Sequence, residues 1–332
     1  MVGKKEGGMY FSPRVKEKRE DFFNYEALQE ELKKALGDRL VPLIAVYGLR
    51  RTGKTSLIRV VLNSLKKRYL WIDGRDVQSR EELKARLLEE TQKLKRFSLK
   101  KISIKGIELS LGLPKEGLDY LNKHKITLVF DEAQLLKNIH LDNTLAYIYD
   151  NYPNIKIIIS GSEIGMLANF LGKENAKAPL YGRAVHELHT YKLDKDKAVL
   201  FLHLGAKQIK IILKDNEISD AISNLGGIIG WLTKYGWFRR DYQHKEALRK
   251  TIDEGKYVAK DEFLKFAQRA EKKYTSIIKV IKGGAYWEEI KKKTGISDKQ
   301  LAAMLKRLLN YGFIEKRDKL YHIADPLLEA AY

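Results

Sequence analysis

The chain has 332 residues, of which 44% are hydrophobic and 32% charged, a composition that excludes disorder for most of the length and predicts roughly two or three domains. Cysteine is absent, which excludes disulfides, a thiol nucleophile and thiolate metal sites. Lys and Arg number 63 against 43 Asp and Glu, so the formal net charge is +20 and polyanions such as nucleotides, nucleic acid or an acidic surface are the favoured partners.

The chain begins with a polar, mostly basic segment, residues 1–20, which we expect to be a loosely held arm. It lacks the apolar run of a secretory signal, and no apolar stretch approaches the roughly 20 residues of a membrane helix. We therefore expect a cytoplasmic protein with no membrane partner. An amphipathic helix predicted over residues 26–36 opens the first folded domain, residues 21–190.

A strand, a glycine-containing loop and a helix follow in succession. Residues 41–47 form a short apolar, β-branched run that predicts a buried strand, and residues 57–65 are amphipathic. The loop between them matches G-x-x-x-x-G-K-[ST], and its residues are Gly48, Leu49, Arg50, Arg51, Thr52, Gly53, Lys54, Thr55 and Ser56. Its glycines let successive N–H groups face one point, where the helix N-terminus adds its positive dipole end. We expect the loop to bind a nucleotide, with Lys54 on the β- and γ-phosphates and the Thr55 hydroxyl on Mg²⁺.

An acidic pair ends a later strand. After a strand predicted at residues 68–73, a helix at 80–94 and a β-hairpin at 101–111, residues 126–130 form an apolar strand that leads into Asp131 and Glu132. Ligands bind at the carboxyl ends of strands in open α/β sheets. We expect Asp131 to contact Mg²⁺ and Glu132 to orient and deprotonate an attacking water.

A further strand, predicted at residues 155–159, ends in Ser160-Gly161-Ser162. A small polar residue here would lie between the loop and the acidic pair and sense the γ-phosphate. The alternative is a simple strand-to-turn transition, and spacing does not decide whether Ser160 or Ser162 points inward.

These motifs, together with residues 130–134 and 179–183, resemble the archaeal ATPase family, in the STAND and AAA-like branch of P-loop ATPases. The resemblance implies a three-layer αβα parallel sheet of the AAA+ or ASCE type, followed by an α-helical lid and a C-terminal winged helix-turn-helix. It also implies ATP as the nucleotide, because no guanine-reading N-K-x-D motif occupies the expected place. By the same resemblance Arg183 contacts the γ-phosphate or reports hydrolysis, either in its own subunit or on a neighbour. Pairing with a surface carboxylate is the alternative.

The chain departs from the family pattern at two positions. Tyr25 stands where the family has an arginine, which puts any role for that arginine in doubt. Ile229 stands where a proline follows the pair Gly226-Gly227, and we expect this to change only how a helix begins.

The second half of the chain is predicted to be mainly helical. In the lid, residues 191–261, Asp194 caps a helix through Phe201 and Leu204, and more helices are expected at 218–225 and 227–237. Another is expected at 261–273, where the winged helix-turn-helix of residues 262–332 begins. That unit has predicted helices at 274–281, 286–293 and 298–310, the last capped by Ser297, and strands at 313–316 and 320–323.

The basic residues of this winged helix do not decide whether its partner is DNA or protein. The candidate contacts to duplex DNA lie on the third helix and the wing: Lys299, Lys306, Arg307, Lys316 and Arg317. Winged helices also dock proteins or associate with themselves, and the charge of residues 262–332 does not choose between these uses.

We therefore expect an Mg²⁺-dependent ATPase switch in which hydrolysis moves the lid and the winged helix, with DNA as one candidate partner. One alternative is a DNA-binding regulator, or a replication or mobile-element factor, in which ATP mainly sets conformation. A third hypothesis is a signalling switch that docks a protein partner.

Overall fold

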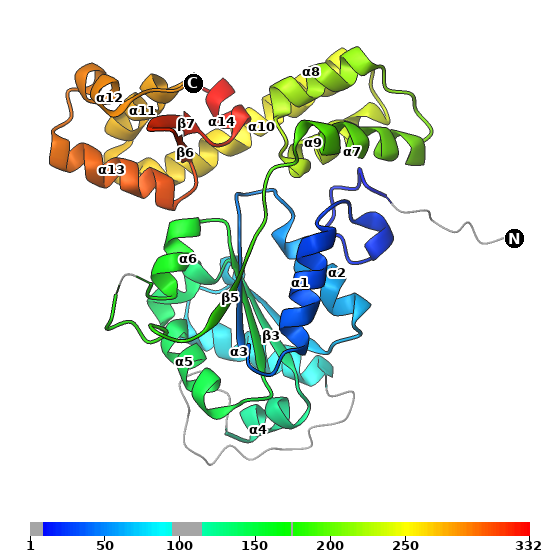
Figure 1. The fold of residues 1–332 in the computed structure, drawn as a ribbon, viewed down its shortest axis with the longest axis vertical. Coiled ribbons are helices and arrows are strands. Elements are labelled where there is room, and N and C mark those ends of the chain that lie inside the picture. Colours follow the sequence, from blue (N-terminus) through cyan, green and yellow to red (C-terminus); the bar gives the residue numbers. More distant parts are fainter. Residues whose placement is uncertain (1–8, 95–114, 174) are drawn as a thin grey trace, which may run out of the picture.

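Five parallel strands form the central sheet of the computed structural model, which describes residues 9–94, 115–173 and 175–332 (Figure 1). The strands are β1 (Leu43–Tyr47), β2 (Tyr69–Asp73), β3 (Thr127–Asp131), β4 (Lys156–Gly161) and β5 (Val185–His189). Their order is β2-β3-β4-β1-β5, and the register pairs Val46 with Ser160 and Phe130 with Ile159. Because neighbouring strands are all parallel, the carboxyl ends of β1, β3 and β4 meet at one edge of the sheet.

Helices cover both faces of the sheet, which confirms the predicted three-layer architecture. One face carries α1 (Glu26–Gly37) and α2 (Lys54–Ser64), and the other carries α3 (Arg80–Leu94), α4 (Lys115–Lys123), α5 (Leu141–Asn151) and α6 (Ile164–Phe170). Alternate residues of β1 enter the two cores, with Ala45 on one side and Val46 on the other. Strands buried on both faces need continuous apolar sequence, which is why β1 and β3 are apolar runs rather than alternating patterns.

Short 3-10 helices join several of these elements. They are η1 (Arg19–Asp21), η2 (Gly74–Asp76), η3 (Ala133–Ile139) and η4 (Gln268–Ala270).

A helical region follows β5 and surrounds a core of its own. It consists of α7 (Lys195–Gln208), α8 (Asp215–Leu225), α9 (Ile229–Arg239) and the first part of α10 (His244–Ala267). Asp194 caps α7 as predicted, because its carboxylate accepts a hydrogen bond from the Lys197 N–H at 2.8 Å.

The prediction of a separate helix at residues 261–273 is wrong, because α10 begins at His244 and continues to Ala267. Apart from Leu248, its buried residues recur every four positions, at Ala247, Thr251, Gly255, Ala259, Phe263 and Ala267. This stripe consists mainly of small residues, so it gives a weak apolar signal in the sequence. The predicted boundary between residues 261 and 262 lies inside α10, which therefore enters the cores of both the helical and the C-terminal regions.

The C-terminal region has the predicted winged-helix order. It contains α11 (Glu271–Ile281), α12 (Trp287–Thr294), α13 (Asp298–Asn310), the antiparallel pair β6 (Ile314–Arg317) and β7 (Leu320–Ile323), and α14 (Pro326–Ala330). Ser297 occupies the N-cap position of α13, but its side chain makes no capping hydrogen bond. The turn of the wing places Asp318 and Lys319 at positive φ, 46° and 70°.

Residues 9–18, which we call the N-terminal strap, are packed against the rest of the molecule rather than loosely held as predicted. Phe11 is 3% exposed and lies in the core of the helical region, with its ring centroid 5.6 Å from that of Phe201. The Lys16 N–H donates to the Ser56 hydroxyl at 3.0 Å, which joins the strap to α2. The prediction of a loose arm rested on the many basic residues of the segment. The segment is instead anchored by one buried aromatic side chain, Phe11.

The predicted hairpin at residues 101–111 lies outside the described residues. Over the described ranges, no helix combines the length and the apolar character that crossing a bilayer requires.

Candidate functional site

The loop from Gly48 to Ser56 joins β1 to α2, and its two glycines are required by its geometry. A Cβ on Gly48 would lie 1.9 Å from Thr190 Oγ1, so no larger residue fits there. Gly53 precedes α2 with a φ of 94°, in the left-handed region that favours glycine. The first N–H groups of α2, which have no acceptor within the helix, therefore stand at the end of a tightly curled loop.

A cavity of about 400 Å³ opens beside this loop. It is lined by residues from the ends of several strands and by one residue of α10: Arg50, Arg51, Gly53, Lys54, Thr55, Ser56, Arg75, Glu132, Gln134, Leu135, Ser162, Glu163 and Glu262. Four of these side chains are basic and three are acidic. The cavity can therefore bind an anion that contacts several charged side chains at once.

Thr55 and Asp131, the two predicted magnesium ligands, lie in contact. The Thr55 hydroxyl donates to Asp131 Oδ2 at 2.8 Å, and the Ser160 hydroxyl donates to Oδ1 of the same carboxylate. Burial raises the pKa of Asp131, and the hydrogen bonds from Ser160 and Thr55 oppose that effect. A carboxylate beside a hydroxyl is a hard oxygen donor set, which fits Mg²⁺.

Glu132 is held in one orientation. Its backbone has a φ of 51°, a left-handed conformation that a non-glycine residue adopts only where its surroundings enforce it. Its Oε2 accepts hydrogen bonds from the Ser162 N–H at 3.0 Å, the Ser162 hydroxyl at 2.9 Å and Gln134 Nε2 at 2.7 Å. Burial by itself raises the pKa of Glu132, but the Lys54 ammonium and these hydrogen bonds outweigh it and keep the pKa below its ordinary value. The carboxylate is therefore ionised at neutral pH.

Ser160 and Ser162 both contact the acidic pair, Ser160 through Asp131 and Ser162 through Glu132. Both side chains therefore point inward: Ser160, in β4, is fully buried, and Ser162, directly after β4, is 4% exposed. Their role in sensing a phosphate stays a prediction.

Lys54 lies at the floor of the cavity, with 5% of its surface exposed. Its Nζ donates to the carbonyl oxygens of Gly48 at 2.9 Å and Leu49 at 2.8 Å. Burial lowers the pKa of Lys54 to about 8, although the Glu132 and Asp131 carboxylates act in the opposite direction. A bound anion would favour the charged form of this side chain.

The structure does not bring Arg183 into the site. Arg183 precedes β5, whose first residue, Val185, pairs with the first residue of β1, so it lies at the amino ends of the strands while the loop lies at their carboxyl ends. A five-residue strand separates the two edges by about 16 Å. Arg183 donates to both carboxylate oxygens of Asp150, at 3.1 and 2.6 Å, and to the Pro179 carbonyl. Arg183 therefore pairs with a surface carboxylate, which was the alternative that the sequence left open. At this edge of the sheet it does not contact a nucleotide bound in the same subunit.

Five cavity residues were not identified from the sequence as site residues: Arg75, Gln134, Leu135, Glu163 and Glu262. Arg75 comes shortly after β2, which lies beside β3, so its place near the carboxyl end of a strand could have been predicted from the sequence. Its guanidinium pairs with Asp73 at 2.5 Å. Glu262 carried no such signal, because it is more than 200 residues from the loop in sequence.

A second cavity, of about 550 Å³, adjoins the first and shares Arg51, Gly53 and Ser56 with it. The N-terminal strap, the loop and the helical region enclose it. Its lining is rich in aromatic rings: Tyr10, Phe22, Phe23, Phe201, Trp231 and Trp237. Flat apolar rings of this kind stack well on a planar heterocycle.

The predicted DNA contacts lie on α13 and the wing, and all five side chains are exposed. Some are already engaged within the protein. Arg307 lies over the rings of Phe266 and Tyr311, at 5.2 and 5.7 Å, and Arg317 pairs with Glu315 at 2.5 Å. A contact between these residues and nucleic acid stays a prediction.

Known ATPases are similar to this chain. A family model described as an ATPase domain predominantly from Archaea matches residues 22–235. The solved structure of a Walker-type ATPase of Pyrococcus abyssi is 31% identical, covers 97% of this chain and 99% of that chain, and superposes with a TM-score of 0.87. Cdc6p of Pyrobaculum aerophilum shares the fold at 16% identity, with a TM-score of 0.53 and coverage of 99% of this chain and 97% of that chain.

A relative from Methanocaldococcus jannaschii, itself described as uncharacterized, is 30% identical over 143 residues, which are 42% of this chain and 25% of that protein. This chain thus matches only a quarter of that relative's length. The family model, by contrast, spans more than half of this chain and includes the loop, the acidic pair and both serines. The chain belongs to the family of ATPase domains found predominantly in Archaea.

Proposed function

We propose that this protein binds Mg²⁺-ATP and hydrolyses it to ADP and phosphate, and that the reaction changes the position of the helical and winged-helix regions. The observation that carries the proposal is that Lys54, Thr55 and Glu132 line one cavity at the carboxyl edge of the sheet, where the Thr55 hydroxyl is bonded to the buried Asp131 carboxylate. Membership of an ATPase family supports it.

The two adjoining cavities fit the two ends of ATP. The polar cavity beside the loop suits the phosphates, and the aromatic cavity between the strap and the helical region suits the adenine. Thr55 and Asp131 would hold Mg²⁺, which neutralises charge on the phosphates when it is bound.

The residues of the chain have separate tasks in this proposal. The Lys54 ammonium moves from the loop carbonyls to phosphate oxygens, which satisfy it as hydrogen-bond acceptors and as opposite charges. Glu132 takes a proton from the attacking water while the bond from the γ-phosphorus to ADP breaks. Gln134 and the Ser162 hydroxyl orient Glu132 for this step.

Steady-state ATP hydrolysis by the full chain tests the proposal. We expect Glu132→Gln to lower turnover by at least about 100-fold while nucleotide binding persists, since a positioned general base contributes about 10²–10⁴-fold. Lys54→Ala should lose binding as measured by calorimetry. Glu30→Gln is the matched control, because Glu30 lies on the exposed surface of α1, away from both cavities. Undiminished hydrolysis by either site variant would refute the assignment.

The second candidate function is DNA binding in which ATP mainly sets conformation. The observation in its favour is the set of five exposed basic side chains on α13 and the wing. Hydrolysis measured with and without duplex DNA separates the candidates. Stimulation that disappears at high salt supports DNA coupling, because phosphate contacts release counterions. Turnover that Glu132→Gln removes but DNA leaves unchanged supports a switch that docks a protein partner.

A further inference from the structure

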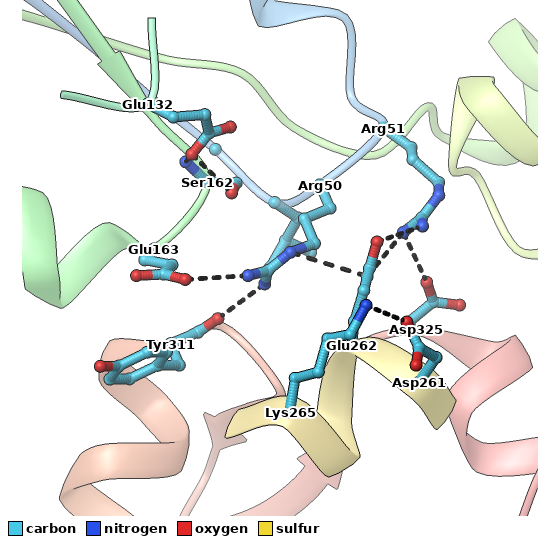
Figure 2. Close-up of polar contacts among 12 residues, drawn as sticks. Arg50, Arg51, Glu132, Ser162, Glu163, Asp261, Glu262, Lys265, Tyr311 and Asp325 are labelled. Atoms are coloured by element: carbon cyan, nitrogen blue, oxygen red, sulfur yellow. Dashed lines mark hydrogen bonds and ion pairs between the residues drawn. The ribbon is translucent and has the colours of Figure 1, made fainter. Parts of the chain in front are cut away.

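Arg51, in the loop, binds the C-terminal half of the chain. Its Nη2 and Nη1 donate to the two carboxylate oxygens of Glu262 on α10, at 2.6 and 3.3 Å, and Nη1 lies 3.9 Å from Asp325 (Figure 2). Its guanidinium also lies 4.3 Å from the ring of Trp231 on α9. One loop side chain therefore touches the helical region, α10 and the segment that precedes α14.

Arg50 makes a second set of contacts beside the first. It donates to Glu163 at 3.0 Å and to the Tyr311 carbonyl, just after α13, at 3.1 Å, and its Nε lies 3.6 Å from Glu262 (Figure 2). Arg50 thus joins the core to the winged-helix region directly. Glu262 is the carboxylate that the two arginines share.

Glu262 also lines the cavity that contains Lys54 and Thr55. A bound triphosphate would place several negative charges in the same space as this carboxylate. Those charges attract the two guanidinium groups and repel Glu262, so the phosphates and Glu262 compete for the same partners. The direction of the effect follows from the signs of the charges alone.

Loss of the contact between Glu262 and the two arginines would affect the whole C-terminal half, because α10 connects its two regions. α10 runs without interruption from the core of the helical region into the core of the winged-helix region. A change at Glu262, in the second half of α10, therefore acts on both regions together.

We propose that Glu262 is the residue through which the C-terminal half senses phosphates in the loop. Arg50 and Arg51 bind Glu262 when the loop holds no nucleotide and bind phosphate oxygens when it does, which releases α10 and the winged helix from the core. The inference rests on the proposed function for the nucleotide and adds the residue that reports its presence.

The absence of cysteine from the sequence makes a distance measurement straightforward. Asn143→Cys on α5 and Lys292→Cys on α12, both at exposed positions, provide two spin-label sites in the full chain, one in the core and one in the winged helix. Electron–electron double resonance then reports the distance distribution with and without Mg²⁺ and a non-hydrolysable ATP analogue. We expect the analogue to shift the distribution of the parent chain, and Glu262→Gln to produce the same shift without nucleotide.

Linkage gives a second readout from the same variant. If docking of the C-terminal half opposes nucleotide binding, then Glu262→Gln should bind the analogue at least about 5-fold more tightly, since couplings between sites are typically 5–150-fold. Glu288→Gln on α12 makes the same change of charge at an exposed position and should behave as the parent chain.

Two negative results are distinguishable. If the parent chain binds the analogue but its distance distribution, and that of Glu262→Gln, stay unchanged, the sensing role is overturned and the proposed function stands. Weaker analogue binding by Glu262→Gln would also overturn it. If the parent chain binds no nucleotide in calorimetry, both proposals fail together.

Discussion

The packing of Phe11 against two glycines predicts a substitution whose effect changes sign with its background. A Cβ on Gly205 in α7 would lie 2.3 Å from the Phe11 ring, and a Cβ on Gly236 in α9 would lie 2.3 Å from the same ring. Such a distance is well inside van der Waals contact, so Gly205→Ala forces the buried ring and the N-terminal strap to move. In Phe11→Ala the three atoms nearest to the added Cβ, all in the Phe11 ring, are absent, so this overlap is relieved.

The magnitudes follow from two opposing effects. Replacing a mid-helix glycine by alanine stabilises by about 1 kcal/mol, whereas overpacking a buried site costs about 1–3 kcal/mol. Gly205→Ala should therefore leave the free energy of unfolding of the parent chain unchanged or lower it by up to about 2 kcal/mol. In the Phe11→Ala background it should raise that free energy by about 1 kcal/mol. The coupling between the two positions is then about 1–3 kcal/mol.

Urea unfolding of the parent, the two single variants and the double variant, followed by circular dichroism, measures this coupling. Gly37→Ala at the end of α1 is the control, because a Cβ there would have no atom within 4 Å. Its effect should be the same in both backgrounds. The reasoning is refuted if Gly205→Ala stabilises the parent chain as much as it stabilises Phe11→Ala, because the ring would then not occupy the space beside Gly205.

Three further predictions concern the candidate site. Without nucleotide the pKa of Lys54 is about 8, and bound phosphates raise it. Mg²⁺-ATP binding should therefore take up protons and weaken as the pH rises through 8. Calorimetry in buffers of different ionisation enthalpy should show the proton uptake, and equal heats in all buffers would contradict it. Tyr25→Phe removes a hydroxyl within 2.8 and 2.5 Å of the carbonyls of Thr52 and Tyr191, so it should lower the free energy of unfolding in urea by about 1–3 kcal/mol; no change would show that water replaces the hydroxyl. Arg183→Gln should leave the Kd for ATP unchanged, because Arg183 is bound to Asp150 at the far edge of the sheet, and a tenfold weakening would contradict this placement.

Features that depend on neighbouring residues were predictable from the sequence. The buried strand before the loop, the glycine pattern, the acidic pair and the N-cap of α7 are each specified within about a dozen residues, because periodicity and turn chemistry act over that range. α13 and β7 agree with their predicted bounds for the same reason, since strong amphipathic patterns and a tight turn delimit them. The meeting of Thr55 with Asp131 was also predictable, because the carboxyl ends of the strands in one parallel sheet share one edge.

Contacts between distant segments were decided by the tertiary structure. The sequence did not indicate that the strap would be anchored by Phe11, that α10 would be continuous, or that Arg183 would lie at the opposite edge from the loop. The pairing of Arg51 with Glu262 joins residues more than 200 positions apart. Such a pair forms only after two separate cores have packed against each other. The charge and size of a side chain determine what it can bind, but the orientation of the packed regions determines which partner lies within its reach.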